Sequence, residues 1–542
     1  MDNKSPLRRY FEQFRFVFLT IFLFYMSMIL LDYYSVIKEN GFSLKPFKTN
    51  GANHHDVDNN NNTPITPSIP SLNFTQNNST TNGVEFNSTQ EKQMIPPPPP
   101  PPLIRDNNNV NVDELIVTPN SNNKAPPIRN SDPCYGQYIY VHKLPSRFND
   151  DLLKRCRSLL HWGDMCPYLT NLGLGPKIIE NAKVLLKDTW YQTNQFSLEV
   201  IFHNIMKHYK CLTNDSALAS AIFVPYYAGL NVGQYLWGYD DRIRDEAPLA
   251  FVEWLSNQKE WKRMWGRDHF LIGGRTAYDF RRKSGDFGDW GTKLMFLPEA
   301  RNMSMLTIET DSYDNDFPIP YPTYFHPSKD LQVSLWQKRM RRMKRPYLFT
   351  FAGAPRPNAP YSIRNELIRQ CLSSRSCKLL SCYKGKNNKN TCEDPVSIMS
   401  VFQRSIFCLE PSGDSYTRRS TFDAILAGCI PVFFHPKSAY EQYRWHLPKD
   451  YLSYSVFIPE GDVRENKAII NDTLARISRT RISKMREEVI RLIPRVTYRE
   501  PRSRLGKVED AFDIAVKGII RRVEEIKKEI SSSTDNVYYS NE

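Results

Sequence analysis

The chain has 542 residues, a formal net charge of +14, and a composition that is 40% hydrophobic and 13% aromatic. This length is too great for one hydrophobic core and predicts two domains with appended segments. The positive charge is compatible with nucleic acid, an anionic membrane or a diphosphate substrate. Because the basic residues are spread along the chain and no nucleic-acid-binding motif accompanies them, we expect no nucleic-acid partner and favour a globular enzyme.

The N-terminus predicts a membrane anchor. An uncharged apolar run at residues 16–31 continues past Asp32 to two tyrosines. Basic residues precede this run and an acidic residue follows it, so we expect a cytoplasmic tail at residues 1–15 and a signal-anchor helix at 16–34, with the rest of the chain lumenal. A cleavable signal peptide is the alternative, but no small-residue cleavage pattern follows.

Residues 35–132 predict a disordered stem rather than a core. They are rich in Asn, Pro, Ser and Thr and include the seven-proline run Pro96–Pro102, which favours polyproline II. A short tail, one anchor and a lumenal stem together predict a single-pass type II protein of the Golgi membrane. Candidate glycosylation sequons lie at Asn61, Asn73, Asn77, Asn78, Asn87, Asn214, Asn302 and Asn471.

All ten cysteines lie beyond the predicted stem, which is compatible with disulfides in an oxidising lumen. Cys408 and Cys429 lie at the edges of apolar strands, where we expect buried free thiols. No C-x-x-C pair is present, so the spacing does not indicate a metal site. Four cysteines in a polar, loop-like insert are the strongest candidates for bridges: Cys371, Cys377, Cys382 and Cys392.

The folded body predicts an alternation of strands and helices, which is typical of parallel α/β domains. We expect a first, acceptor-side domain at residues 133–327 and a second, nucleotide-sugar-binding domain at 328–530, with a flexible tail at 531–542. The elements expected in the first domain are strands at Tyr138–Val141, Ala221–Pro225 and Arg267–Gly274, with helices around residues 196–208 and at Pro248–Trp261. The strands expected in the second domain are Tyr347–Gly353, Ser405–Leu409 and Ile430–Phe434. The helices expected there are a linking helix at 328–344, helices from Ser362 and at Tyr416–Ala427, and an amphipathic closing helix around 512–526.

The turn between Leu409 and the helix expected from Tyr416 is the strongest candidate site. A turn leading from a strand into a helix presents free backbone N–H groups and the positive end of the helix dipole, which suits a phosphate. Arg418 and Arg419 add charged donors of forked geometry, and Asp423 lies on the helix face of Arg419, where its carboxylate can accept from ribose hydroxyls. An ordinary surface pair on a helix is the alternative.

The residues expected to bind a nucleotide sugar are Gly413, Asp414, Ser415, Tyr416, Thr417, Arg418, Arg419 and Asp423, with Arg356 and Arg364 after the preceding strand. Arg419 is the first choice for the diphosphate and Arg418 the alternative. Arg356 and Arg364 are also compatible with a surface or capping role.

The segment GDSYTRRSTFDAILAGCIPVFF resembles the signature of exostosin-like glycosyltransferases, most closely the plant branch that includes the xyloglucan β-galactosyltransferases. WGRDHF matches the same family, and QYIYVHKLPSRFN resembles its opening strand, although an aspartate commonly occupies the position of Lys143. The resemblance covers about residues 133 to 525.

This resemblance implies a GT-B fold, with two facing Rossmann-like domains. It implies inverting transfer of galactose from UDP-galactose to xylosyl side chains of xyloglucan, a step of plant cell-wall biosynthesis in the Golgi. Complexes with other glycosyltransferases are also implied. Galacturonic acid or arabinopyranose as the sugar, and mannan or xylan as the acceptor, remain open, and a polysaccharide-binding protein without activity is an alternative of another class.

Inverting transfer requires a base that deprotonates the acceptor hydroxyl. The candidates are Asp268 and His269, which lie in the WGRDHF motif, and His142, at the end of the first strand. Exposed aromatic residues are candidates to stack on a glucan chain, with core burial as the other interpretation. These aromatic candidates are Tyr226, Tyr227, Trp237 and Tyr239.

A metal-dependent mechanism would use a D-x-D motif, and Asp314–Asp316 has that form. The pattern recurs at Asp56–Asp58 within the predicted stem, so it is weakly specific. Because Asp314 lies in a proline-rich, loop-like stretch, we interpret this motif as structural and expect no metal cofactor.

Overall fold

The computed structural model describes residues 132–539, apart from 180–182, 284–289, 312–313, 360 and 383–389. The predicted cytoplasmic tail, signal-anchor and stem lie outside the described residues, except for Asp132. Among the helices that the structure describes, none is both long and apolar enough to cross a membrane.

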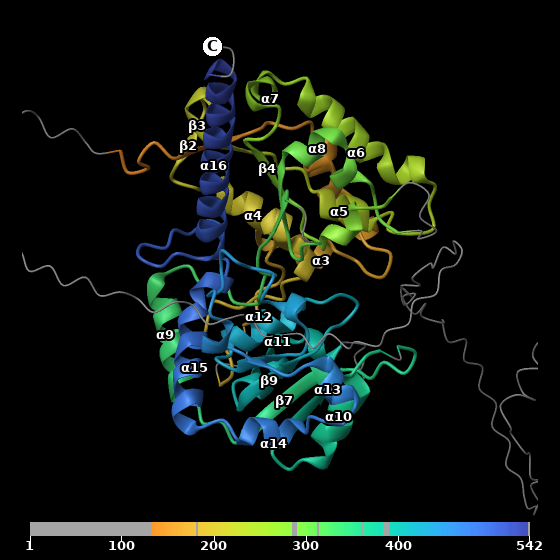
Figure 1. The fold of residues 1–542 in the computed structure, drawn as a ribbon, viewed down its shortest axis with the longest axis vertical. Coiled ribbons are helices and arrows are strands. Elements are labelled where there is room, and N and C mark those ends of the chain that lie inside the picture. The colour runs from red at the N-terminus through yellow and green to blue at the C-terminus, as the bar shows by residue number, and fades with distance from the viewer. Residues whose placement is uncertain are drawn as a thin grey trace, which may run out of the picture. The chain divides into compact units, whose positions relative to one another are not determined.

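Two parallel sheets organise the described chain (Figure 1). The first has the strand order β2-β1-β3-β4-β5-β6 and the second has the order β11-β10-β9-β7-β8. In the first sheet, β2 lies on one side of β1 and β3 lies on the other. In the second sheet, β8 lies on one side of β7 and β9 lies on the other. The strand order therefore reverses direction at β1/β3 and at β7/β9. Open α/β sheets bind ligands at the carboxyl ends of the strands beside such a reversal.

The first sheet is built by β1 (Tyr138–Val141), β2 (Leu212–Thr213), β3 (Ala219–Phe223), β4 (His269–Ile272), β5 (Ser304–Thr307) and β6 (Asp316–Pro318). Its neighbouring helices are α2 (Asp150–Lys154), α3 (Cys166–Leu169), α4 (Leu198–Met206), α5 (Ala228–Gly233), α6 (Asp241–Ser256), α7 (Lys259–Met264) and α8 (Pro298–Asn302). Side chains alternate between two cores: Phe270 and Ile272 pack in the core that contains α4, and Leu271 packs in the core that contains α6.

The second sheet is built by β7 (Tyr347–Gly353), β8 (Cys377–Ser381), β9 (Ser405–Glu410), β10 (Ile430–Phe433) and β11 (Val456–Phe457). Its helices are α9 (Asp330–Arg342), α10 (Arg364–Ser373), α11 (Pro395–Phe402), α12 (Arg419–Leu426), α13 (Glu460–Arg464), α14 (Ile470–Ala475) and α15 (Arg479–Leu492). Phe349 and Phe407 share a core with Leu367 of α10, whereas Cys408 packs on the other face with Trp336 of α9. The prediction of two parallel α/β halves is confirmed.

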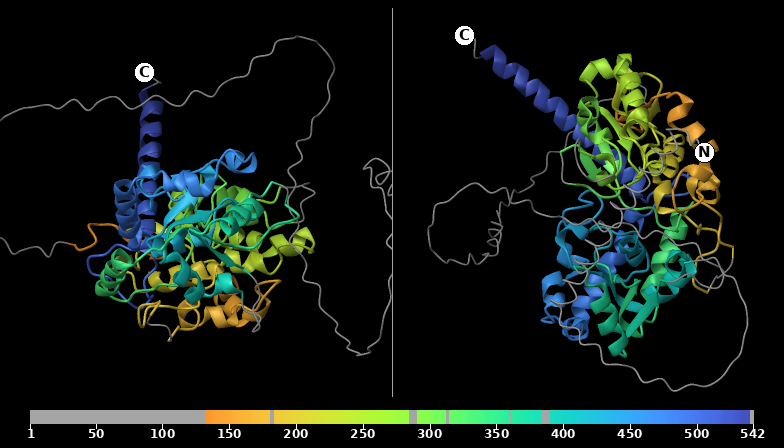
Figure 2. Two further views of the ribbon diagram at one scale, coloured as in Figure 1. Left: turned by 90° about the horizontal axis from the view of Figure 1, so that it is seen from below. Right: turned by 90° about the vertical axis from the view of Figure 1, so that its right-hand side faces the viewer.

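The last helix, α16 (Ala511–Tyr539), returns to the first half of the chain (Figures 1 and 2). Phe512 of α16 packs on Phe202 of α4, with ring centroids 4.6 Å apart. We expected this helix in the second domain, but its apolar face covers the first sheet, so residues 328–530 do not form one unbroken domain. The helix also continues through most of the predicted flexible tail, since a nucleated helix propagates easily.

Two chain segments run between the halves side by side. His326 Nδ1 lies 2.7 Å from the carbonyl oxygen of Tyr498, and the Glu500 N–H donates to the Pro327 carbonyl at 3.0 Å. The chain enters the second half along the first segment and returns along the second, so the halves are joined twice.

Five disulfides connect the ten cysteines. The bridges expected among four of the cysteines are confirmed, as Cys371–Cys377 and Cys382–Cys392, but Cys371 lies in α10 and Cys377 begins β8, so these two do not lie in a loop-like insert. The expectation of free thiols at Cys408 and Cys429 is wrong, because neighbouring strands bring their Cα atoms to 5.8 Å and the two form a bridge. The remaining bridges are Cys134–Cys211 and Cys156–Cys166.

Candidate functional site

The turn between β9 and α12 ends later than its sequence suggests. We expected a helix from Tyr416, but α12 begins at Arg419, and Arg418 before it is extended, with φ −149° and ψ 145°. The Thr417 N–H donates to Glu309 at 3.0 Å, so this backbone donor is bound to a carboxylate from the first half of the chain. Residues 411–418 are therefore not helical, and the helix begins only at Arg419.

Three arginines converge beside this turn: Arg356, Arg364 and Arg418. Arg356 Nη1 donates to Asp414 Oδ1 at 2.5 Å, while Arg418 Nη1 and Arg364 Nη2 both approach Gly413. A Cβ atom at Gly413 would collide with the Arg418 guanidinium, which would have to move, so the glycine leaves room for this close approach. Burial, together with the charges of Arg418 and Arg356, lowers the pKa of Arg364 to about 9.

Acidic side chains near these arginines only partly offset their charge. Burial raises the pKa of Glu410, at the end of β9, to about 8, so this carboxyl is largely protonated at neutral pH. Its Oε1 has no hydrogen-bond partner among the described residues, and Oε2 accepts from the Ser420 hydroxyl. Asp414, ion-paired with Arg356, is the nearby carboxylate that remains charged. The turn therefore presents an excess of positive charge, which suits a diphosphate.

The place of the three arginines in the sheet agrees with this chemistry. Arg356 follows β7, Arg364 begins α10, and Arg418 follows β9. Strands β7 and β9 are direct neighbours and form the point at which the strand order of the second sheet reverses. This is the position at which open α/β sheets bind ligands.

Arg419 and Asp423 point elsewhere. Arg419 Nη1 donates to the Thr193 carbonyl at 2.7 Å, and its guanidinium carbon lies 3.5 Å from the centre of the Tyr324 ring. Arg419 Nε lies 3.8 Å from Asp423 Oδ2, and burial raises the pKa of Asp423 to about 6. The structure thus brings Arg418, rather than Arg419, together with Arg356 and Arg364. The expected roles of Arg419 and Asp423 stay predictions.

Glu309, which follows β5, connects the first half to the turn. Its carboxylate accepts from the Ser415 hydroxyl at 2.6 Å and from both the N–H and the hydroxyl of Thr417. Tyr321 Oη lies 3.0 Å from Thr417 Oγ1 and adds a second contact from the first half. Burial raises the pKa of Glu309, although these donors favour its charged form.

Tyr416 is the one exposed ring of the turn, with 41% of its surface accessible. It stacks on His435, with ring centroids 4.3 Å apart, and Lys437 Nζ lies 5.5 Å from its centre. These partners follow β10. Tyr416 therefore forms the boundary of the turn on the β10 side.

The three candidate bases form one buried chain. Asp268 Oδ1 lies 2.7 Å from His269 Nδ1, and His269 Nε2 lies 3.2 Å from His142 Nε2. Asp268 and His269 are fully buried and His142 is 4% exposed, because Trp254 of α6 and Trp261 of α7 pack on the histidines. Burial, with some effect of the neighbouring His269, lowers the pKa of His142 to about 3.

His269 begins β4, at the amino end of that strand. An acceptor hydroxyl does not reach the enclosed Asp268–His269–His142 chain in this conformation. A role for any of the three as the base stays a prediction that their burial does not support.

The D-x-D segment makes structural contacts. Arg281 Nη2 lies 2.9 Å from Asp316 Oδ2, and the Thr310 hydroxyl donates to Asp316. The interpretation of this motif as structural agrees with these contacts. Within the described ranges, no group of three or more His, Cys, Asp or Glu side chains is placed to hold a metal ion.

Sequence reasoning missed Glu309 and Glu410. Each directly follows a buried apolar run, MSMLTI or SIFCL, and so occupies the carboxyl end of a parallel strand. An acidic residue immediately after such a run is a signal that was available in the sequence. Of the aromatic candidates, Tyr226 and Tyr227 are buried in the core, while Trp237 is half-buried and Tyr239 exposed.

Fold and site define a class: a protein of two parallel α/β halves that presents a cationic turn at the carboxyl end of the second sheet. The Exostosin GT47 domain matches residues 133–473, and the chain belongs to this glycosyltransferase family. The family expected from the sequence is therefore confirmed.

The relatives are plant enzymes. The chain is 55% identical over 414 residues to xyloglucan galactosyltransferase MUR3 of Arabidopsis thaliana, an alignment that covers 76% of this chain and 66% of that protein. It is 52% identical over 419 residues to the probable xyloglucan galactosyltransferase GT12 and 55% identical over 394 residues to GT14, both from the same plant. These two alignments cover 76% and 72% of this chain, and 81% and 75% of the relatives.

Proposed function

We propose that this protein is an inverting galactosyltransferase that moves galactose from UDP-galactose to the xylosyl side chains of xyloglucan. The convergence of Arg356, Arg364 and Arg418 at the strand-order reversal of the second sheet carries the proposal. The names of the Arabidopsis relatives supply the sugar and the acceptor. We propose a GT-B arrangement, with the donor bound by the second half and the acceptor by the first.

The chemistry assigned to the arginines is stabilisation of the leaving group. When the bond between the sugar and the diphosphate breaks, negative charge develops on UDP. Arg418 and Arg364 are held beside Gly413, and Arg356 is fixed by Asp414, so their charges are in place before the reaction begins. The protonated Glu410 adds no opposing charge beside them at neutral pH.

A panel of donors and acceptors tests this function. The full-length chain is incubated with UDP-galactose, UDP-galacturonic acid and UDP-arabinopyranose, each with xyloglucan, mannan or xylan oligosaccharides, and the products are identified by mass spectrometry. We expect transfer from UDP-galactose to xyloglucan. Transfer of another sugar, or to another polymer only, contradicts the assigned specificity, and no transfer in any combination contradicts the enzymatic role.

We also propose a Golgi location with single-pass type II topology. The support is the charge asymmetry around residues 16–34 together with five disulfides, which require an oxidising compartment. The sequon residue Asn214 is exposed, as lumenal glycosylation requires. Protease protection of intact microsomes carrying a tag at either end tests this: the C-terminal tag should be protected and the N-terminal tag digested.

A further inference from the structure

Aromatic rings form a ladder on the first half of the chain. We define it as His161, Trp162, Trp237 and Trp290. The rings of Trp162 and Trp237 are 5.7 Å apart with a 2° angle between their planes, and those of Trp237 and Trp290 are 5.1 Å apart at 13°. His161 stacks on Trp237 at 4.7 Å. Trp162 is 52% exposed, an unusual placement for the largest aromatic side chain.

An internal ion pair supports the ladder from beneath. Arg275 Nη1 lies 3.2 Å from Asp279 Oδ2. The Arg275 guanidinium lies 5.6 Å from the centre of the Trp162 ring, and the indole N–H of Trp290 donates to Asp279 Oδ1 at 2.8 Å. A single buried pair therefore contacts the first and last tryptophans of the ladder.

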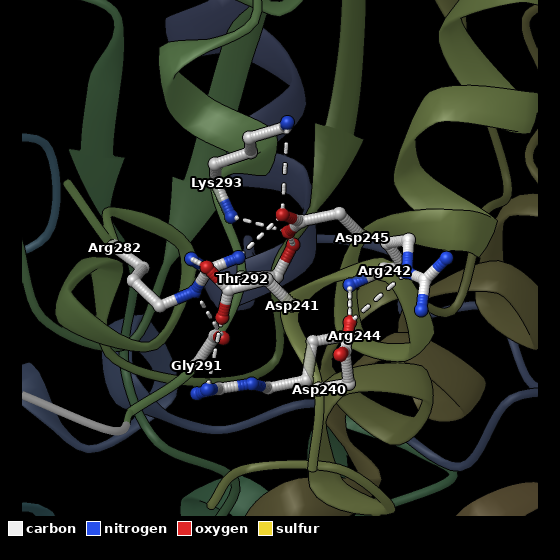
Figure 3. Close-up of polar contacts among 9 residues, drawn as sticks. All are labelled: Asp240, Asp241, Arg242, Arg244, Asp245, Arg282, Gly291, Thr292 and Lys293. Atoms are coloured by element: carbon white, nitrogen blue, oxygen red, sulfur yellow. Dashed lines mark hydrogen bonds and ion pairs between the residues drawn. The ribbon is translucent and has the colours of Figure 1, made fainter. Parts of the chain in front are cut away.

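A second polar network fixes the segments that carry Trp237 and Trp290 (Figure 3). Arg282 donates to Asp241 and Asp245 at the start of α6 and to the Gly291 carbonyl, and Asp245 accepts from Thr292 and from the Lys293 N–H. The Gly291 N–H donates to the Leu236 carbonyl at 2.7 Å. These bonds hold residues 290–293 against residues 236–245, so the rings are positioned before any ligand binds.

The ladder lies close in the fold to the turn at residues 411–418, which we call the donor turn because the proposed function places the sugar donor there. The Ile308 N–H donates to the Arg275 carbonyl at 3.1 Å, and the Ala277 N–H donates to the Glu309 carbonyl at 2.9 Å. The segment that supports Trp162 is thus paired with the segment whose Glu309 side chain contacts Ser415 and Thr417. A polymer lying on the ladder would be close to a sugar held at the turn.

We propose that this ladder binds the glucan backbone of the acceptor polysaccharide, with Trp162 as the main contact. Pyranose rings present C–H faces that pack on aromatic rings, and Trp gives the largest such surface. The neighbouring carboxylates, Asp245 and Asp279, are already bonded to Arg, Lys, Thr and Trp donors, which favours an uncharged ligand. This inference rests on the proposed function, since it assigns the acceptor of that reaction to a place on the first half.

The test compares two exposed tryptophans. Trp162→Ala removes the outer ring of the ladder, while Trp265→Ala removes a ring that is 62% exposed at the end of α7 and is not part of the ladder. Binding of a xyloglucan oligosaccharide to the full-length chain in the presence of UDP is measured by calorimetry. We expect the Kd to rise about five- to tenfold in Trp162→Ala and to stay unchanged in Trp265→Ala. Trp162→Phe should recover most of the affinity.

Further readouts separate this proposal from a folding defect and from the proposed function. UDP affinity and the thermal midpoint should not change in Trp162→Ala, and the acceptor KM should rise while kcat at saturation is kept. An unchanged acceptor Kd in both Trp162→Ala and Trp237→Ala, or an equal rise in Trp265→Ala, overturns the ladder as the acceptor site. Wild-type chain that binds xyloglucan through Trp162 yet transfers no galactose contradicts the proposed function and leaves the ladder standing.

Discussion

The carboxyl ends of the two sheets carry opposite kinds of chemistry. At the second sheet, Arg364 and Arg418 approach Gly413 and Arg356 pairs with the adjacent Asp414, in the segments that follow β7 and β9. At the first sheet, rings of tryptophan and histidine form a ladder. The Arg275–Asp279 ion pair, in which the two charges balance, supports this ladder. The two sheets share the same order over their first five strands, so the contrast lies in the loops, which determine what each edge can bind.

Loss of Arg418 is expected to have the largest effect on the donor half. Arg418→Ala removes a charge that converges with Arg364 at Gly413, and we expect kcat/KM for UDP-galactose to fall about 100-fold, measured by initial rates. Arg419→Ala should reduce UDP affinity much less, since Arg419 contacts Thr193 and Tyr324 instead. Arg342→Ala, on the exposed side of α9, is the matched control and should behave as wild type. A larger loss in Arg419→Ala would reverse the assignment.

Substitution of Glu309 tests whether the two halves bind their proposed ligands separately. Glu309→Gln keeps the shape of the side chain but weakens the bonds to Ser415 and Thr417. We expect kcat to fall about tenfold, while the Kd values of UDP and of xyloglucan oligosaccharide, measured by calorimetry, change less than about threefold. This pattern would show that Glu309 positions one half against the other.

A different outcome would change the role of Glu309. A loss of more than about 1000-fold in kcat, with both ligands still bound, contradicts a positioning role and identifies Glu309 as the base instead. Glu366→Gln provides the control, because that carboxylate pairs with Arg369 on the surface of α10.

The pH dependence of UDP affinity is the smallest expected effect. The pKa of Glu410 is raised to about 8 by burial, so the group is neutral below this value and gains a negative charge above it. Because the new charge repels a diphosphate, UDP affinity should fall about fivefold between pH 7 and pH 9. Glu410→Gln should make this dependence shallower without abolishing it when calorimetric titrations are repeated across the range, because Arg364, whose pKa is lowered to about 9, also begins to lose its charge there. An equally steep fall in the variant would assign the titration to another group.

The donor turn was recognisable in the sequence because its residues are contiguous. Strand, turn, glycine and arginines follow one another between Ser405 and Phe434, and Gly428 has the positive φ of +61° expected at a helix end. What the sequence did not show is the direction of each side chain. Adjacent residues Arg418 and Arg419 point to different partners because Arg418 is extended while Arg419 begins α12.

The ladder as a whole was not recognisable, because its residues are far apart in the sequence, although Trp237 was among the aromatic residues named as candidates to stack on a glucan chain. Trp162, Trp237 and Trp290 lie in three separate loops, and only tertiary packing makes them parallel. Sequence patterns report local periodicity, so a surface assembled from distant loops leaves no periodic signal. The same limit applies to the Cys408–Cys429 bridge, which depends on β9 and β10 being neighbours.

The return of α16 to the first sheet has a consequence for biosynthesis. The core around Phe202 and Phe223 stays uncovered until residues 511–526 have been made, although its own strands leave the ribosome much earlier. The second half, in contrast, has all of its strands and other helices by Leu492. In a nascent chain the order of completion is therefore reversed: the half synthesised first is finished last, and its apolar core stays uncovered for longer.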